Sequence, residues 1–289
     1  MKIKIEYWFD LKASASPLKY QPCKGGFDMR VLQLRIVKVC ISLIIILIFT
    51  VPCYAAIDPK SIAALWLFDE GSGTIAKDSS GNGKDGSIKG GAKWVQGKFG
   101  KAIELNGTDA WTEIPSIGTF DEVTIATWVM TTGRTGQWRS IIDNNGWKAG
   151  DIHHQLYGDN RVGFSINGNP GGNDQLGKFT FDDSQLNKWH HLATIYSDKT
   201  KKIQFYVDGQ LDVETAWGGN PGIIGPARIG SWDGAGREWQ GMIDEFAIFN
   251  VVLSADDVKT VMNSGLKGVT AVSNLGKLAT TWATVKTDF

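Results

Sequence analysis

Residues 202–211 read KIQFYVDGQL, and this stretch decides the fold class. Its apolar side chains alternate at Ile203, Phe205 and Val207, which is the period of a β-strand with one face on a core. An Asp-Gly pair at 208–209 then interrupts the alternation. Such a pair suits a type I′ turn, because both central residues of that turn need a positive φ. The stretch therefore predicts a β-hairpin with one buried face and one wetter face.

Similar strand signals recur throughout residues 57–289. Of the 35 glycines, all except Gly25 and Gly26 lie there, many of them in clusters that mark turns. Between the clusters lie short apolar or β-branched runs at 64–68, 102–105, 123–129, 140–142, 162–166, 191–196, 227–230 and 241–249. Many short strands separated by turns predict an all-β sandwich or barrel.

One short helix is predicted near the C-terminus. Residues 253–262 read LSADDVKTVM, in which Ser254 is the expected N-cap and Asp257 follows three residues later. The apolar side chains at 258, 261 and 262 have the spacing of one helix face. Gly265 is the expected end of the helix.

The N-terminal part has the features of an export signal. Residues 41–51 form the unbroken apolar run ISLIIILIFTV, with basic residues before it and the small residues Cys53 and Ala55 after it. This order is typical of a secretory signal peptide. We therefore expect a signal peptide at 29–56 and a secreted or extracytoplasmic protein. Residues 1–28 are then predicted to be a mis-assigned start or a disordered segment.

The alternative for the N-terminal part is a membrane anchor. In that case a cytoplasmic tail would precede a single uncleaved helix at residues 36–56, and the protein would be membrane-anchored. The apolar run is shorter than the roughly 20 residues that a spanning helix needs, which favours the signal peptide.

Charge and cysteine content exclude several function classes. Of 30 basic and 30 acidic residues, eight and three lie in 1–56, which leaves 22 and 27 in residues 57–289. A mildly acidic region without a basic patch is not typical of nucleic-acid binding. All three cysteines precede residue 57. The rest of the chain can therefore form neither a disulfide nor a thiolate metal site.

Seven sequence blocks occur in a family-specific order. They are LFDEGSG at 67–73, DSSGNGKDG at 78–86, FGKAIELNG at 99–107, TIATWV at 124–129, KWHHLA at 188–193, FYVDG at 205–209, and RIG with GMIDEFAIF at 228–230 and 241–249. On these blocks the chain resembles, over residues 62–265, the laminin G-like jelly-roll family of the concanavalin A-like lectin/glucanase superfamily, in its bacterial exported branch.

The resemblance implies an all-β, two-sheet antiparallel jelly-roll sandwich whose first and last strands are adjacent. The domain is expected at residues 57–265, and a C-terminal tail at 266–289. Because this fold carries many functions, it does not by itself name a ligand.

Calcium is the candidate cofactor. The loop 78–86 holds several oxygen-bearing side chains among three glycines, and Ca²⁺ prefers about six to eight oxygen ligands in a flexible loop. Relatives often bind a structural Ca²⁺ with such a loop and an Asp of the last strand. The resemblance therefore implies Asp78, Asn82 and Asp244 as ligands. The alternative is a plain turn cluster, since Asp, Ser, Asn and Gly are the usual turn residues.

Nine of the twelve tryptophans fall into two groups. Three lie within strand motifs and are expected in the core: Trp66, Trp128 and Trp189. Six lie in or beside Gly-rich, polar stretches: Trp111, Trp138, Trp147, Trp217, Trp232 and Trp239. An exposed indole offers a flat apolar face with an N–H at its edge, which suits the apolar face and hydroxyl rim of a sugar ring.

Carbohydrate or another extracellular polymer is therefore the expected ligand. The predicted ligand-binding residues are Trp138, Arg139, Trp147, His153, Asn167, Asn169 and Asp174. Two alternatives stay open: these tryptophans could pack the ends of the sandwich, or they could anchor a protein partner in adhesion.

Catalysis is not expected. Glycosidases of this shape need two carboxylates about 5 to 10 Å apart, and a Glu-x-Asp-x-Glu run on one strand would supply them on one face. The chain has no such run, and Asp69-Glu70 and Asp244-Glu245 are adjacent pairs whose side chains point to opposite faces of a strand. No common hydrolase motif is present either. A glycoside hydrolase is the less favoured alternative to a binding module.

Overall fold

The computed structural model describes residues 57–133, 138–172, 174–233 and 236–269. The predicted signal peptide, start and anchor all lie outside these residues, as does the tail beyond 269, so they stay predictions. In the part of the chain that is described, no helix is long and apolar enough to cross a membrane.

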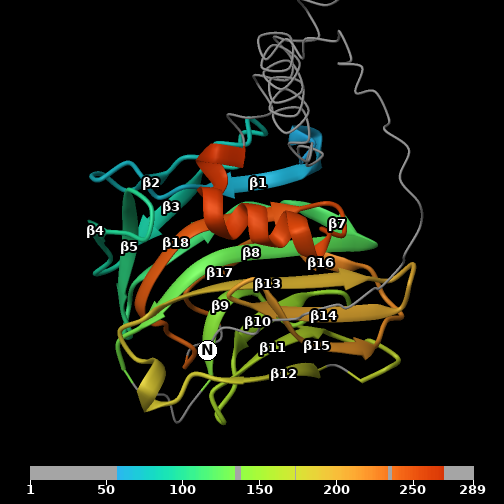
Figure 1. Cartoon of the computed structure of the whole chain (residues 1–289). Coiled ribbons are helices and arrows are strands. Elements are labelled where there is room, and N and C mark those ends of the chain that lie inside the picture. The colour runs from blue at the N-terminus through green and yellow to red at the C-terminus, as the bar shows by residue number, and fades with distance from the viewer. Residues whose placement is uncertain (1–56, 134–137, 173, 234–235, 270–289) are drawn as a thin grey trace, which may run out of the picture. The chain divides into compact units, whose positions relative to one another are not determined.

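Two eight-stranded antiparallel sheets form the fold (Figure 1). Sheet A has the order β15 (Gln210–Ala216), β14 (Lys202–Val207), β13 (Trp189–Ser197), β8 (Glu122–Thr131), β18 (Gln240–Phe249), β5 (Lys101–Asn106) and β4 (Lys93–Gln96), with β1 (Ile62–Trp66) also paired to β18. The sandwich prediction and the adjacency of the first and last strands are both confirmed, since β1 runs antiparallel to β18.

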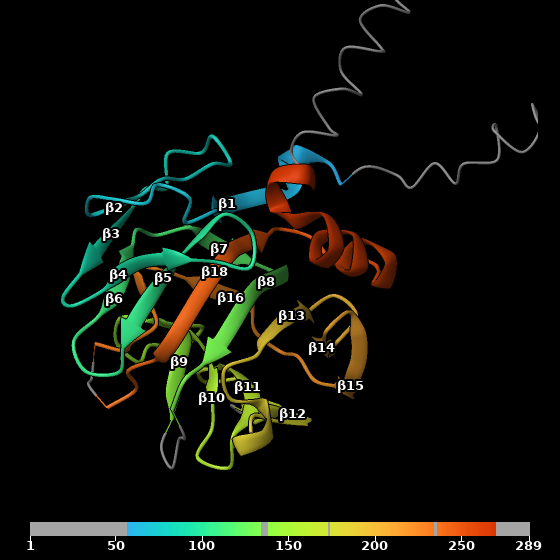
Figure 2. The ribbon, with the colours of Figure 1, turned by 60° about the vertical axis from the view of Figure 1, so that its left-hand side comes forward.

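Sheet B faces sheet A across the core (Figure 2). Its order is β12 (Asp174–Thr180), β11 (Arg161–Ile166), β10 (Ile152–Leu156), β9 (Arg139–Asn144), β17 (Ala227–Ile229), β6 (Trp111–Ile114), β3 (Gly86–Lys89) and β2 (Ile75–Ala76). A small pair, β7 (Gly118–Phe120) with β16 (Gly222–Ile224), and two 3-10 turns, Pro59–Ser61 and Asp183–Gln185, complete the described elements.

The core lies between the inner faces of the two sheets. Sheet A contributes Ile103, Val129 and Phe205, and sheet B contributes Ile142 and Phe164, all at most 1% exposed. Burial of each such side chain stabilises the fold by about 1.5–3 kcal/mol relative to leaving it in water. The alternation predicted for residues 202–207 is therefore confirmed.

The predicted hairpin turn is also confirmed. Asp208 has a φ of 50° and Gly209 a φ of 72°, as a type I′ turn requires. The preceding strand β14 pairs with β15 from Val207–Gln210 onward.

A helix covers part of the outer face of sheet A. Helical backbone runs over residues 255–269, so the prediction that it ends at Gly265 is wrong. Gly265 has a φ of 67° inside this run, and the next residue, Leu266, donates its backbone N–H to Glu245 Oε2 at 2.8 Å. Val258 and Val261 pack with Leu65 and Phe249 in a second apolar cluster. The tertiary contact at Glu245 thus carries the chain past a residue that would end an isolated helix.

Candidate functional site

A row of polar side chains crosses the outer face of sheet B. It follows the register of six neighbouring strands, β12, β11, β10, β9, β17 and β6, and consists of Asp174, Ser165, His153, Asp143, Arg228 and Glu113. The residues beside them in sequence, such as Ile142 and Phe164, point into the core. Since side chains alternate along a strand, the row faces away from the core.

His153 and Asp143 are fully buried although they lie on an outer face. Trp147 covers His153, because the two rings are stacked with centroids 4.4 Å apart and an interplanar angle of 29°. Trp232 stands edge-on to both rings, at 6.0 Å from Trp147 and 6.3 Å from His153. These aromatic rings therefore remove His153 and Asp143, in the middle of the polar row, from solvent, whereas Asp174 at one end of the row stays exposed.

Arg237 joins the aromatic residues together. Its guanidinium lies 4.3 Å from the ring of Trp232, 4.9 Å from that of Trp138 and 5.5 Å from that of Trp147. Such cation–π contacts are electrostatically favourable. We call Trp138, Trp147, Trp232 and Arg237 the aromatic cluster. Trp147 is 51% exposed and Trp138 36% exposed, so two indole rings of the cluster face solvent.

Hydrogen bonds and an ion pair join the buried groups beneath the aromatic cluster. Arg237 Nη1 lies 3.1 Å from Asp143 Oδ2. The amide nitrogen of Asn167 lies 3.2 Å from His153 Nε2. An amide nitrogen can only donate, so Nε2 accepts this hydrogen bond and Nδ1 carries a proton. That proton faces Asp143 Oδ1, at 3.6 Å from Nδ1.

The structure brings together three of the predicted ligand-binding residues, Trp147, His153 and Asn167. Trp138 joins them through Arg237 and also packs on Tyr157, with centroids 4.5 Å apart. Tyr157 in turn contacts Ser165 through its hydroxyl.

Three other predicted residues lie at the margin of this group. Arg139 donates from Nη1 to Gly133 O at 2.7 Å, and burial lowers its pKa to about 10, which leaves it charged at neutral pH. Asn169 accepts from Gly171 N within its own turn. Asp174 accepts from Ser165 Oγ, two strands away from His153.

Three residues of the site, Asp143, Trp232 and Arg237, are absent from the predicted ligand-binding set, although Trp232 is among the six tryptophans predicted beside Gly-rich, polar stretches. Asp143 follows two buried isoleucines in β9, so alternation places it on the outer face. Nothing local pairs it with His153, because their contact depends on the register of β9 and β10. Arg237 lies in a Gly-rich segment beside Trp239, and only the tertiary fold carries it to the aromatic cluster.

The remaining tryptophans divide as follows. Trp217 is 3% exposed and Trp239 is fully buried, so these two pack the sandwich. Trp66 lies in the core as predicted. Trp189 does not, because its side chain is only half-buried at the start of β13; the prediction of a core position is wrong for this residue.

The surroundings of Asp78 do not suit a cation. Its carboxylate accepts hydrogen bonds from Leu65 N, Ser80 N, Ser80 Oγ and Lys84 N, at 2.6 to 3.1 Å. Asn82 donates its amide to the carbonyl oxygens of Ile62 and Ala63. Hydrogen-bond donors thus already fill the positions around Asp78 that a Ca²⁺ ion would need.

Asp244 lies apart from Asp78. Residue 78 bridges to Trp66, and Trp66 pairs with Phe246 of β18, which places residue 78 two strand spacings, about 10 Å, from that strand. Burial raises the pKa of Asp244 to about 7, while Phe99 N donates to its Oδ2. Among the described residues no three His, Cys, Asp or Glu side chains form a group that could hold a metal. Calcium binding therefore stays a prediction. Asp78, Asn82 and Asp244 do not together form a ligand set that fits a Ca²⁺ ion.

Comparisons with known proteins agree with the fold. The family model described as the concanavalin A-like lectin/glucanases superfamily matches residues 106–259. Among curated proteins none matches the chain. Domain 4 of AbnA, an extracellular arabinanase from Geobacillus stearothermophilus solved with arabinotriose, has a TM-score of 0.50 at 19% identity, over 70% of this chain and 98% of that one.

Bacterial toxin binding domains have the same fold. A botulinum neurotoxin type C structure, described as showing cell entry that depends on two ganglioside molecules, has a TM-score of 0.56 at 16% identity, over 71% of this chain and 51% of that one. The binding domain of botulinum neurotoxin DC with rat synaptotagmin II has a TM-score of 0.56 at 15% identity, over 71% of this chain and 52% of that one. The chain spans about half the length of these toxin chains. Because the family model covers more than half of its residues, this chain belongs to the concanavalin A-like lectin/glucanases superfamily, as its sequence blocks predict.

Proposed function

We propose that this protein is an exported, non-catalytic module that binds a glycan through the aromatic cluster on sheet B. The observation that carries the proposal is the half-exposed Trp147, held flat on the buried ring of His153. An indole fixed in one orientation is a platform for the apolar face of a sugar ring, and it loses little conformational entropy on binding.

Polar groups at the edge of the platform could read the sugar hydroxyls. Asn167 lies beneath the platform, only 3% exposed, and its amide nitrogen donates to His153, which holds the platform in place. The Arg237 guanidinium supplies further N–H groups beside Trp138 and Trp147. Aromatic faces with a few fixed polar groups are the usual composition of a small-ligand site.

The solved relatives support the same class of ligand. The arabinanase domain was solved with arabinotriose, and it matches this chain over 98% of its own length. At 19% identity this likeness supports a shared fold. That this chain also binds a sugar is our proposal.

The carboxylates of the polar row favour binding over catalysis. Asp143 is paired with Arg237, and Glu113 accepts from Trp111, Asn145 and Arg228. Glycoside hydrolysis requires one carboxylic acid that can give up its proton and a second carboxylate. Asp143 and Glu113, each held by an arginine, do not supply that acid, and the third carboxylate of the row, Asp174, lies at its end on β12 and accepts from Ser165 Oγ.

Glycan-array binding of the full-length protein tests the proposal. The parent protein should retain a related set of glycans, and Trp147→Ala should weaken retention about tenfold or more, as loss of an aromatic contact of about 1.4 kcal/mol predicts. Trp94→Ala is the matched control, because Trp94 lies on β4 of the other sheet and donates to Gly73 O. Retention that is equal in the parent and the Trp147 variant would overturn the site assignment.

A protein ligand is the second candidate. Exposed tryptophan and arginine side chains are also the commonest anchors of protein interfaces, and one relative was solved with synaptotagmin II. Failure of the parent protein to retain any glycan on the array would move the proposal to this class.

A further inference from the structure

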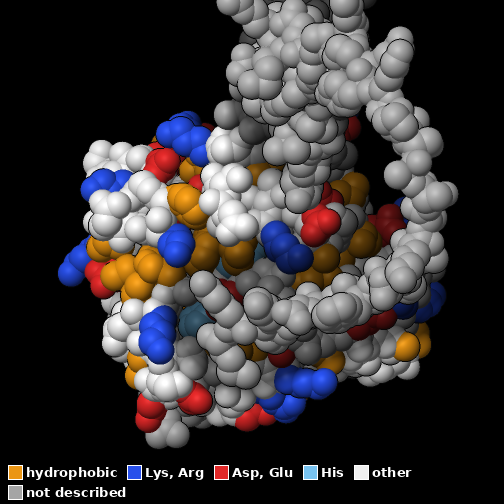
Figure 3. Space-filling view, in the orientation of Figure 1, with side chains coloured by type: hydrophobic (Ala, Val, Ile, Leu, Met, Phe, Trp, Pro, Cys, Tyr) orange, Lys and Arg blue, Asp and Glu red, His pale blue; other side chains and the backbone are white. Residues whose placement is uncertain are grey.

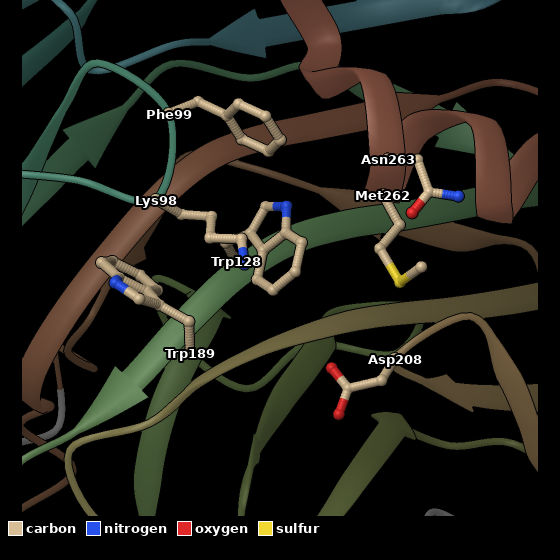
Figure 4. A pocket seen from close by; sticks show the side chains of 7 residues that line it. All are labelled: Lys98, Phe99, Trp128, Trp189, Asp208, Met262 and Asn263. Atoms are coloured by element: carbon tan, nitrogen blue, oxygen red, sulfur yellow. The ribbon is translucent and has the colours of Figure 1, made fainter.

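A pocket of about 420 Å³ opens on sheet A, on the opposite side of the sandwich from the aromatic cluster. It is lined by Lys98, Phe99, Trp128, Trp189, Asp208, Met262 and Asn263 (Figure 4). These residues come from the loop between β4 and β5, from β8 and β13, from the β14–β15 turn and from helix 255–269. On the described part of this face, hydrophobic side chains gather with basic and acidic side chains around them (Figure 3).

Two adjacent buried carboxylates on β18 hold opposite walls of the pocket in place. Both face the outer side of sheet A because the strand register shifts between Asp244 and Ala247, where Glu245 has a φ of 48°, so the expectation that this pair points to opposite faces is wrong. Asp244 Oδ2 accepts from Phe99 N at 2.9 Å and so fixes the β4–β5 loop. Glu245 Oε2 accepts from Leu266 N at 2.8 Å and so fixes the helix. Both contacts are independent of any ligand, so the pocket is formed in advance and a ligand need not order its walls.

The β14–β15 turn is fixed in the same way. Asp208 accepts from His191 N at 2.9 Å and lies 2.9 Å from His190 Nδ1. A Cβ atom added at Gly209 would lie 3.2 Å from the terminal methyl of Met262, so the turn and the helix are in close contact. The Met262 methyl group therefore lies between two walls of the pocket, where its NMR signal can report on a bound ligand.

Three aromatic side chains, Phe99, Trp128 and Trp189, share the lining with polar groups. Trp128 forms the floor, with Phe99 at 6.2 Å between ring centroids and the Lys98 ammonium 4.3 Å above its ring. Trp128 is 6% exposed, and its Nε1 has no hydrogen-bond partner among the described residues. Figure 4 shows that this nitrogen points toward the space between Phe99 and Asn263.

The polar groups of the lining have no net charge. Lys98 offers a donor, Asp208 an acceptor, and Asn263 both. A ligand that matches these walls carries apolar faces together with hydroxyls that can both donate and accept, and it is uncharged. Sugar residues have this combination, and the volume lies within the range of about 300–1,000 Å³ of small-ligand pockets.

We infer that this pocket is a second saccharide-binding site, which takes one or two neutral sugar residues against the exposed part of Trp189, beside the Lys98 ammonium that covers Trp128. It is separate from the aromatic cluster on sheet B. The protein is then a bivalent module that engages two glycan chains, or two segments of one chain, on opposite sides of the sandwich.

Methyl NMR of the full-length protein tests this inference at the pocket itself. With ¹³C-methyl-labelled methionine, the Met262 signal is assigned by loss in Met262→Leu, and arabinotriose, cellotriose and chitotriose are titrated as probes. We expect the Met262 signal to shift with at least one probe. Trp189→Ala should weaken the affinity reported by Met262 about tenfold, as for loss of one aromatic contact.

Further variants separate the two sites. Trp147→Ala should leave the Met262 titration unchanged, because Trp147 lies on the other sheet. If Trp189→Ala does not fold, Lys98→Ala serves as a second pocket variant, because the Lys98 side chain is exposed. A Met262 signal that does not move with any probe up to about 10 mM, well above a millimolar Kd, would overturn the inference even if sheet B binds glycan. A shift produced only by a proline-rich peptide would also overturn it and assign the pocket to a protein ligand.

Discussion

At the scale of single residues, the buried pair of Asp143 and Arg237 holds the aromatic cluster in place. Asp143 is fully buried, and the guanidinium that neutralises it also contacts three indole rings. A buried carboxylate that loses its partner is left uncompensated in a poorly solvated position. The same contact thus serves both the stability of sheet B and the orientation of the predicted platform.

Arg237→Met is therefore expected to lower the free energy of unfolding by about 3–5 kcal/mol, measured by urea denaturation. In the double variant with Asp143→Asn the loss should be smaller than the sum of the two single losses, because the unpaired charge is gone. Lys199→Met is the matched control. The Lys199 side chain of the Lys199–Glu122 ion pair is exposed, so this pair should contribute about 1 kcal/mol or less. Equal losses for Arg237→Met and Lys199→Met would contradict the proposed role.

His154 makes the stability of the protein depend on pH. It is buried in the core beside Phe164, its Nε2 lies 3.0 Å from Thr194 Oγ1, and burial lowers its pKa to about 3. As the pH falls below about 6.5 the unfolded chain takes up a proton that the folded protein does not, so the folded state loses about 1.4 kcal/mol per pH unit down to the folded pKa. His154→Gln removes this loss.

The parent should thus lose stability relative to His154→Gln between pH 6.5 and about 4, by about 1.4 kcal/mol per unit, in urea unfolding at several pH values. Thr194→Val removes the same hydrogen bond without a titrating group, so its difference from the parent should stay constant. A constant difference for His154→Gln as well would show that the ring takes up its proton at the same pH in the folded protein as in the unfolded chain.

At the scale of elements, the loop 78–86 is organised by hydrogen bonds to one carboxylate. Asp78 accepts from three backbone N–H groups and one hydroxyl, and in this way ties the loop to β1. Asp78→Ala should lower the unfolding free energy by about 3 kcal/mol, because hydrogen bonds to a charged group contribute about 1.5–3 kcal/mol each and not all of them are lost independently.

Thermal denaturation with and without EDTA shows whether the hydrogen bonds to Asp78 stabilise the loop without a bound metal. We expect EDTA to leave the Tm of the parent unchanged, and Asp78→Ala to lower the Tm equally in both conditions. Ser80→Ala, which removes the hydroxyl donor alone, is the milder control. An EDTA-sensitive Tm in the parent that becomes insensitive in Asp78→Ala would instead establish the calcium site that the family resemblance implies.

The elements also mark what local sequence can predict. Alternation and the Asp208-Gly209 turn predict the β14–β15 hairpin, since period and turn chemistry act over a few residues. The extent of the helix is not local, because Glu245 holds Leu266 from a strand about twenty residues earlier. The exposed indole of Trp147 is predictable from its Gly-rich surroundings, whereas the Asp143–His153 and Arg237 contacts depend on strand register and on loop placement, which no short stretch encodes.

At the scale of the whole molecule, two aromatic surfaces lie on opposite sides of one core. The aromatic cluster belongs to sheet B, and the pocket belongs to sheet A and helix 255–269. The core cluster between the sheets contains none of the residues of the aromatic cluster and none of those that line the pocket. Sites that share no partners contribute independently, so binding at one should leave the other intact.

A molecule with two independent sites should cross-link a soluble polysaccharide. The parent protein is expected to make a solution of arabinan, or of another polymer that it retains, turbid near equal numbers of sites and sugar segments. Turbidity should fall again at protein excess, where each segment is occupied by a separate molecule.

Trp147→Ala and Trp189→Ala should each abolish turbidity while retaining oligosaccharide binding at the remaining site, and Trp94→Ala should behave as the parent. Turbidity that survives in either single-site variant would mean that cross-linking comes from self-association of the protein, and the two surfaces would then have to act through an assembled oligomer.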